Sequence, residues 1–268
     1  MVIFLMLIVL VAAYLLALRG RTGHKGLPEL CRWNYAHRGL HGDGIPENSM
    51  AAFKLALWKG YGIELDVHLL KDGGLAVIHD SKLLRTTGAE GIVEDLTTEE
   101  LTNYHLEGTL QTIPTLQDVL DLFSGQAPLI IELKAENGNY GQLAETVCKA
   151  MEHYKGPYCI ESFDPRCIQW LKNNRPRIIR GQLASNFLKE KNLKMPLWQR
   201  FALSNLLMNF LTRPDFIAYR FEDRNGLAPT LCRKLWKVQD VSWTLRRRED
   251  FDTAVAEKMI PIFEGFEV

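Results

Sequence analysis

Short apolar segments alternate with longer amphipathic segments along the chain after residue 30. The apolar segments predict eight strands, at Trp33–Ala36, Ile63–Val67, Leu129–Leu133, Tyr158–Ile160, Ile178–Leu183, Phe216–Tyr219, Val241–Leu245 and Ile260–Phe263. Apolar positions at helical spacing predict helices between the strands, at Ser49–Trp58, Thr115–Phe123, Gly141–His153, Arg166–Lys172 and Asp250–Glu257. This alternation predicts an α/β fold, a (β/α)8 TIM barrel, over residues 31–268. An open doubly wound sheet is the alternative, but no glycine-rich nucleotide-binding motif follows a strand.

One apolar segment breaks the alternation. Leu75–Ile78 follows the second predicted strand after only Lys71-Asp72-Gly73-Gly74, and Asp-Gly is a strong signal for a two-residue hairpin loop. Such a loop would place Asp66 opposite His79. The added strand would be antiparallel, so it would lie outside the ring of parallel strands.

A polar segment, residues 81–112, follows this hairpin. Within it, Asp95–Glu100 has the composition of a helix start. We therefore expect a small insertion in the barrel after the second strand, covering about residues 70–112. No internal repeat or low-complexity segment is visible in the chain.

The first residues have a different character, because Val2–Leu18 contains no charged residue. A helix of that length would be about 25 Å long, just enough for a thin bilayer. The flank over residues 19–25 is basic. A secretory signal peptide would require a positive residue before the apolar stretch, and no Lys or Arg is present there. These features predict a transmembrane anchor over residues 1–20 and a linker over residues 21–30.

The same basic flank predicts a location. Positive residues beside a membrane segment favour its cytoplasmic side. We therefore expect a single-pass protein of the cell membrane whose catalytic domain lies in the cytoplasm. A buried helix of a soluble protein is the alternative, but it would rarely be so uniformly apolar.

Composition narrows the classes of function. The 268 residues carry 32 Lys and Arg against 32 Asp and Glu, so a general nucleic-acid-binding role is disfavoured. Apolar residues make up 47% and charged residues 24%, which is ordinary for a folded globular chain. The five cysteines form no CxxC pair, so we expect buried, reduced thiols and neither a disulfide framework nor structural zinc.

Carboxylates occur at the ends of two apolar strands. Glu64 and Asp66 are two residues apart and therefore point to one face of their strand, where unpaired burial would be costly. Glu132 and Lys134 repeat this arrangement at the end of another strand. A divalent cation held by the three carboxylates would offset the cost, and salt bridges to Lys or Arg are the alternative.

Two histidines also follow strands. His37-Arg38 comes after the first strand and His79-Asp80 ends the hairpin. Imidazoles exchange protons near neutral pH, and the guanidinium of Arg38 has a geometry suited to phosphate. Together with a cation and Lys134, these groups suit the displacement of an alcohol at phosphorus.

The motifs that carry these residues resemble the glycerophosphodiester phosphodiesterase family. The motifs, in chain order, are Ala36-His37-Arg38-Gly39, Pro46-Glu47-Asn48-Ser49, Glu64-Leu65-Asp66-Val67, Lys71-Asp72-Gly73, His79-Asp80, Ile113-Pro114-Thr115-Leu116, Ile131-Glu132-Leu133-Lys134, Ser162-Phe163 and Trp243-Thr244. The resemblance covers about residues 33–265, and its specific part is residues 36–80, where five motifs occur in order.

The resemblance implies a TIM barrel with an insertion after the second strand and an enzyme that cleaves glycerophosphodiesters to sn-glycerol 3-phosphate and an alcohol. It implies one divalent cation, Mg²⁺ or Ca²⁺, held by Glu64, Asp66 and Glu132. The remaining implied roles are general acid and base for His37 and His79, phosphate binding for Arg38 and Lys134, and pocket lining for Trp243.

Some features depart from the family pattern or leave alternatives open. Leu245-Arg246 and the last strand, Ile260–Phe266, differ from the usual family sequence around the alcohol group. Residues 186–214 are long, basic and apolar, and they predict either a plain barrel helix or an amphipathic flap. The alternatives for function are a lysophospholipase D and an inactive membrane-tethered binding module. The attacking group is water or the 2-hydroxyl of the substrate.

Overall fold

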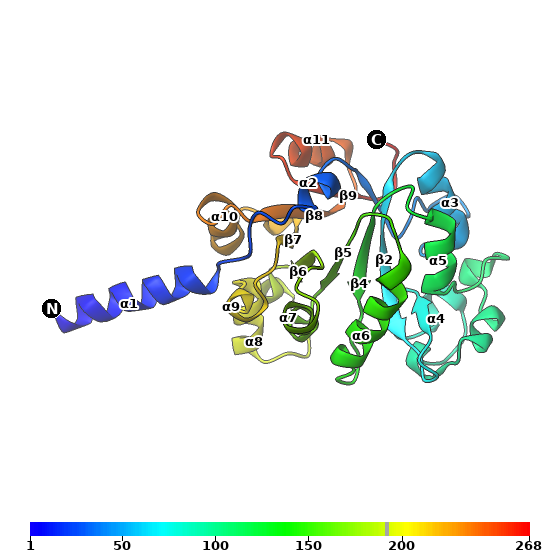
Figure 1. Ribbon diagram of the computed structural model, residues 1–268, viewed down its shortest axis with the longest axis horizontal. Coiled ribbons are helices and arrows are strands. Elements are labelled where there is room, and N and C mark those ends of the chain that lie inside the picture. The colour runs from blue at the N-terminus through cyan, green and yellow to red at the C-terminus, as the bar shows by residue number, and fades with distance from the viewer. Residues whose placement is uncertain (191–192) are drawn as a thin grey trace.

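Eight parallel strands close into a barrel in the computed structural model, which describes residues 1–190 and 193–268 (Figure 1). The strands are β1 Tyr35–His37, β2 Gly62–Leu69, β4 Leu129–Leu133, β5 Tyr158–Ser162, β6 Arg180–Ala184, β7 Phe216–Arg220, β8 Gln239–Leu245 and β9 Ile260–Phe263. Strand β1 pairs with both β2 and β9, and this pairing closes the ring. The predicted TIM barrel is confirmed, and the open doubly wound sheet is excluded.

Helices cover the outside of the barrel. They are α3 Met50–Trp58, α5 Leu116–Phe123, α6 Tyr140–Ala150, α7 Pro165–Asn174, α8 Leu197–Ser204, α9 Asn209–Thr212, α10 Leu227–Lys234 and α11 Arg248–Ala256. The short helix α2, Leu27–Leu30, lies across the end of the barrel where the strands begin. Local sequence sets several of their starts: Ser49 caps α3, and Thr115 forms a capping box at α5. The sequence did not predict α10, because Gly226 and Pro229 interrupt the apolar pattern where it begins.

The antiparallel strand β3, Leu75–Val77, pairs with β2 one residue out of the predicted register. Asp66 lies opposite Ile78, whose N–H donates to the Asp66 carbonyl at 3.1 Å, and not opposite His79. The prediction was wrong because the loop has three residues, Lys71–Gly73, with Gly73 at φ +86°. His79 lies beyond the end of β3, and this position lets it face the mouth of the barrel.

The chain between β3 and α5 forms a small cap with a core of its own. It contains α4 Leu84–Thr87 and three 3-10 helices, at Val93–Asp95, Glu99–Asn103 and Leu106–Gly108. The buried residues of this core are Leu70, Ala76, Ile78, Leu83, Val93, Leu96, Leu101, Leu106 and Ile113. The cap is thereby anchored to the β2–β3 hairpin, near the end of the barrel where the strands finish.

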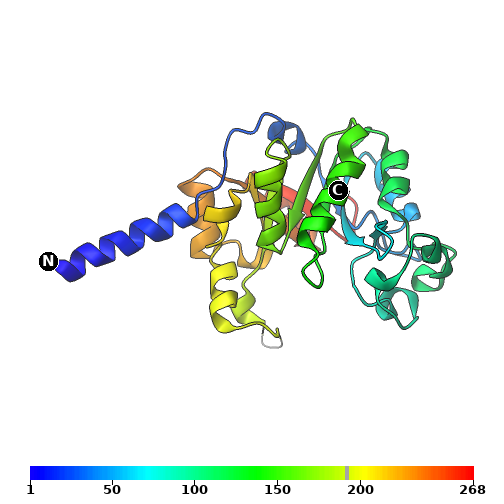
Figure 2. The same cartoon turned by 60° about the horizontal axis from the view of Figure 1, so that its bottom comes forward.

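The N-terminal helix α1, Val2–Ala17, extends away from the barrel (Figures 1 and 2). It has 16 residues, and no helix among the described residues is long and apolar enough to cross a membrane. The predicted transmembrane helix over residues 1–20 is therefore not confirmed. The helix ends at Ala17, and Leu18 directly after it is fully buried, with its carbonyl accepting from Asn209 Nδ2 at 3.2 Å. The predicted cytoplasmic location stays a prediction.

Residues 21–30, expected as a linker, pack across the end of the barrel where the strands begin. The Arg21 guanidinium binds the buried Asp215 carboxylate, with Nε to Oδ1 at 2.5 Å. Leu30 is buried, and its carbonyl accepts from the Tyr35 hydroxyl at 2.9 Å. These contacts cover the end of the barrel opposite the site described below.

Apolar side chains fill the interior, and the cysteines belong to it. All five cysteines are free thiols, and four of them are buried, as predicted.

Inside the barrel, the ring of Phe216 on β7 lies directly over the backbone of Gly181 on β6. A Cβ at residue 181 would come within 2.0 Å of that ring. This position therefore requires the absence of a side chain.

We predict that Gly181→Ala destabilises the protein by about 1–3 kcal/mol, the usual effect of overpacking a filled core. Denaturant unfolding would measure this as a lower midpoint. The control is Gly141→Ala in α6, where a Cβ would meet only ordinary contact with Trp170 at 3.4 Å and where Ala is the better helix former. Equal midpoints for Gly181→Ala and the parent chain would contradict the packing described here.

Candidate active site

A pocket of about 520 Å³ opens at the end of the barrel where the parallel strands finish. Catalytic residues of TIM barrels lie at this end. Six of the eight predicted site residues line it: His37, Arg38, Glu64, His79, Glu132 and Trp243. The other two, Asp66 and Lys134, form an ion pair with each other, and Lys134 also pairs with Glu132 of the pocket lining. The structure therefore brings all eight together.

Three buried carboxylates form the floor of the pocket. Glu64 and Asp66 project from the same face of β2, and Asp66 pairs in register with Glu132 of the neighbouring strand β4. One oxygen from each carboxylate lies within 4.8 Å of the other two. The prediction that these residues share one face of the barrel is confirmed, and oxygen donors in this number and spacing suit a hard divalent cation.

Two cations partly compensate the carboxylates. Lys134 Nζ lies 2.9 Å from Asp66 Oδ1 and 2.7 Å from Glu132 Oε1. Arg38 Nε lies 3.3 Å from Asp66 Oδ2, and the Arg38 backbone N–H donates to Glu64 Oε2 at 3.1 Å. The salt-bridge alternative from the sequence is therefore present, together with the carboxylate cluster.

Lys134 and Arg38 do not fully compensate the negative charge of the three carboxylates. Burial and the neighbouring carboxylates raise the pKa of Glu64 well above its usual range, and burial also raises the pKa of Glu132. Asp66 behaves oppositely: burial opposes its ionisation, but Lys134 and other nearby positive groups hold its pKa below the usual range. The site therefore holds one firmly ionised carboxylate and two that need a further positive charge. A divalent cation held by Glu64, Asp66 and Glu132 would supply that charge, so the residues present fit the predicted metal.

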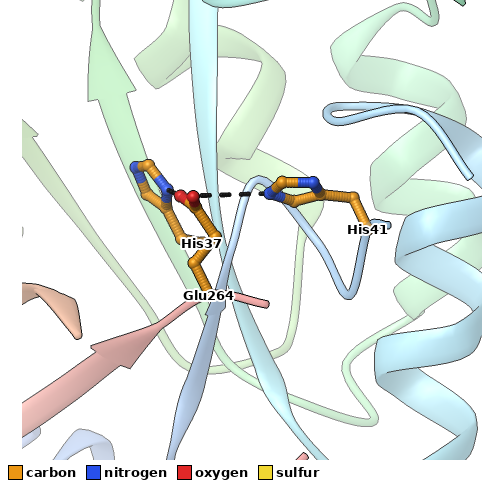
Figure 3. A group of neighbouring side chains, drawn as sticks. All are labelled: His37, His41 and Glu264. Atoms are coloured by element: carbon orange, nitrogen blue, oxygen red, sulfur yellow. Dashed lines mark hydrogen bonds and ion pairs between the residues drawn. The ribbon is translucent and has the colours of Figure 1, made fainter. Parts of the chain in front are cut away.

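Glu264 orients His37, as Figure 3 shows. Its Oε2 lies 2.5 Å from His37 Nδ1, and His41 Nε2 approaches the same oxygen at 4.0 Å. With Nδ1–H donated to the carboxylate, His37 Nε2 is the nitrogen free for chemistry. That nitrogen lies 3.8 Å from Glu64 Oε2, so it faces the acidic floor.

His79 is held in the same manner by Asp80. Its Nδ1 lies 2.5 Å from Asp80 Oδ1, and Asp80 in turn binds Arg85. Arg85 also binds Glu47, which accepts from Arg38 Nη1 at 3.0 Å. Burial is the main cause that lowers the pKa of His79, to about 4, so its Nε2 is an unprotonated acceptor at neutral pH.

Sequence reasoning missed three residues of the site. Glu264 was seen as a departure in the last strand, but no role was assigned to it. Glu161 on β5 is buried against the pocket in register with Glu132, and burial raises its pKa well above the usual range. Asn48 donates from Nδ2 to Asp66 Oδ2 at 2.8 Å. The signal for Glu161 in the sequence was a carboxylate at the end of an apolar strand. The signal for Asn48 was its place in the family motif Pro46-Glu47-Asn48-Ser49.

The sequence matches the model of the glycerophosphoryl diester phosphodiesterase family over residues 37–253. The chain belongs to this family. A glycerophosphodiester phosphodiesterase of Caldanaerobacter subterraneus subsp. tengcongensis is 32% identical over 230 residues, which cover 82% of this chain and 88% of that relative. One of Bacillus altitudinis is 44% identical over 130 residues, and that alignment spans 45% of this chain and only 53% of the relative.

A solved structure agrees with the fold of this family member. The Oleispira antarctica phosphodiesterase, determined in complex with the product sn-glycerol-3-phosphate, has a TM-score of 0.73 at 22% identity. The superposition covers 91% of this chain and 95% of that one. At this identity the likeness supports the barrel architecture alone.

We predict that Glu264→Ala lowers kcat strongly, because His37 loses the acceptor that fixes its Nδ1–H and its ring orientation. The loss is bounded by the roughly 10²–10⁴-fold that a positioned acid or base contributes. Glu264→Gln keeps an acceptor oxygen and should lose less. Steady-state kinetics of both variants would measure this, and an unchanged kcat in Glu264→Ala would refute the orienting role.

We predict that Glu64→Gln raises the Tm of the cation-free protein and abolishes the further Tm increase on adding Mg²⁺ or Ca²⁺. A carboxyl whose folded pKa is raised binds its proton more tightly when folded, so it costs stability as pH rises above its unfolded pKa of about 4.3. The Tm advantage of Glu64→Gln should therefore grow as the pH increases. Glu249→Gln, at an exposed position, is the control and should keep the cation response. A full cation response in Glu64→Gln would rule out Glu64 as a ligand.

Proposed function

We propose that this chain is a divalent-cation-dependent hydrolase that cleaves glycerophosphodiesters to sn-glycerol 3-phosphate and an alcohol. One observation carries the proposal. Three buried carboxylates, two cations and two carboxylate-oriented imidazoles converge on one pocket at the catalytic end of a TIM barrel. Membership of the phosphodiesterase family supports the same reaction.

Binding of the substrate phosphate is assigned to Arg38 and Lys134. Both cations are fixed by carboxylates, so they are already oriented when the phosphate arrives. Glu64, Asp66 and Glu132 would hold Mg²⁺ or Ca²⁺, which stabilises negative charge on phosphate oxygens when it is bound. Trp243 lines the pocket, and its indole N–H is held by the Ala218 carbonyl at 3.0 Å.

Proton transfer is assigned to the Nε2 atoms of His37 and His79. One imidazole takes the proton of the attacking oxygen as that oxygen bonds to phosphorus. The other donates a proton to the alcohol oxygen as its bond to phosphorus breaks. Burial lowers the pKa of both imidazoles, and the approach of an anionic phosphate favours the protonated form that the acid requires.

The test uses the purified full chain with glycerophosphocholine and Mg²⁺ or Ca²⁺, and it measures release of glycerol 3-phosphate. We expect cation-dependent release that EDTA abolishes. His37→Ala and His79→Ala should each lower kcat by about 10²–10⁴-fold. His153→Ala is the matched control and should leave kcat unchanged, because His153 is exposed and lies before β5 begins, whereas the pocket opens where the strands finish. Absence of release with either cation would overturn the proposal.

A further inference from the structure

A second group of metal-ligating side chains lies beside the pocket, in addition to the three carboxylates of the floor (Figure 3). It consists of His37, His41 and Glu264, and one ligand atom from each residue lies within 4.8 Å of the other two. His37 is the last residue of β1, His41 lies on the loop that follows, and Glu264 comes directly after β9, which pairs with β1. Closure of the barrel therefore brings two imidazoles and one carboxylate together.

His41 is the member of this group whose position the fold does not explain. Its Nε2 atom is buried and has no hydrogen-bond partner among the described residues. The ring points toward Glu264 from the side opposite His37, and Nε2 lies 4.0 Å from Glu264 Oε2, which is beyond hydrogen-bond distance. A buried nitrogen without a partner is costly, and an ion bound between His41 and Glu264 would remove that cost.

The spacing of the three ligand atoms is close to that of a tetrahedral zinc site. Zinc binds histidine nitrogen at about 2.0–2.1 Å and carboxylate oxygen at about 2.0–2.2 Å, so its ligand atoms lie roughly 3.3 Å apart. His37 Nδ1 lies 2.5 Å and His41 Nε2 4.0 Å from Glu264 Oε2, one below and one above that value. Small rotations of the side chains reach it. Two imidazoles and one carboxylate are also a ligand set that zinc uses where its fourth position stays open.

Glu264 gives this group its negative charge. Burial opposes the ionisation of Glu264, but the hydrogen bonds from His37 and Arg246 hold its pKa below the usual range, at about 2. Arg246 competes with a metal for the same carboxylate, because its Nε donates to Glu264 Oε1 at 2.8 Å. The Arg246 side chain is 61% exposed, so it can turn into solvent. The other nearby cation, Arg38, is already paired with Asp66.

We propose that His37, His41 and Glu264 form a binding site for Zn²⁺ and that zinc bound there inhibits the enzyme. Zinc takes the lone pair of His37 Nδ1, and the proton on that nitrogen moves to Nε2. Nε2 then lacks the lone pair that proton transfer requires. The inhibition rests on the proposed phosphodiesterase function, whereas the binding of zinc does not.

The two metal sites differ in the cation that they prefer. Hard cations such as Mg²⁺ and Ca²⁺ bind carboxylate oxygens, which the floor of the pocket supplies through Glu64, Asp66 and Glu132. Imidazole nitrogen is a better ligand for zinc than for these ions. The protein therefore separates an activating cation from an inhibitory one by the chemistry of the ligands.

The first test is calorimetric titration of Zn²⁺ into the full chain at saturating Mg²⁺, which occupies the carboxylate site. We expect a single zinc ion per chain. His41→Ala should weaken zinc binding by more than the roughly 10–100-fold that loss of an outer-shell partner costs a metal site. Arg246→Gln should strengthen it, because this substitution removes the cation that competes for Glu264. Equal affinity in His41→Ala and the parent chain would overturn the site.

Two further variants serve as controls in the same titration. His153→Ala removes an exposed imidazole of another part of the chain and should bind zinc as the parent chain does. Glu64→Gln removes a ligand of the carboxylate site and should retain zinc binding. Loss of zinc binding in Glu64→Gln together with its retention in His41→Ala would place zinc at the carboxylates and contradict the proposal.

The second test measures turnover of glycerophosphocholine at fixed Mg²⁺ and increasing Zn²⁺, relative to the zinc-free activity of each variant. The inhibition constant of the parent chain should match the calorimetric Kd, and His41→Ala should raise both by the same factor. Zinc that binds through His41 without inhibiting would overturn the inhibitory role. If glycerophosphocholine is not hydrolysed but zinc binds through His41, the proposed function fails and the zinc site stands.

Discussion

The cost of burying carboxylates in the mouth of the barrel governs the arrangement around it. Glu64, Asp66, Glu132 and Glu161 are all nearly inaccessible to solvent. Their mutual repulsion in a medium of low dielectric would oppose folding without compensation. A rigid barrel tolerates this cost because its strands are held by pairing on both sides, and the remaining imbalance is what makes the site attractive to a divalent cation.

The ion pairs that compensate the buried carboxylates also fix the loops around the pocket. Arg38 adopts φ +56° immediately after β1, which points its guanidinium back over Asp66. From there an unbroken series of ion pairs passes through Glu47, Arg85 and Asp80 to His79. Arg38 and His79, to which we assign phosphate binding and proton transfer, are therefore parts of a single network, and displacement of one member disturbs the others.

The wall of the pocket is mixed in character. Strands β2 and β4 supply the carboxylates of the floor, while Phe163 after β5 and Trp243 on β8 supply aromatic surface. Charged residues from the segments after β6 and β7 also line the pocket, and Asp223 there pairs with both Lys189 and Arg220. The barrel end therefore gathers charged and aromatic groups from many strands and loops around one cavity.

The sequence alone determined the barrel, because alternating apolar and amphipathic segments report burial on both faces of a parallel sheet. It also determined which carboxylates share a strand face, because Glu64 and Asp66 are two residues apart. The tertiary structure decided what depends on distant contacts. Glu264 meets His37 across 227 residues of sequence, because β9 closes against β1. A three-residue loop decided the hairpin register. The periodicity of the sequence shows to which face of a strand or helix a side chain points. Only the closed barrel decides which residues from different strands lie next to each other.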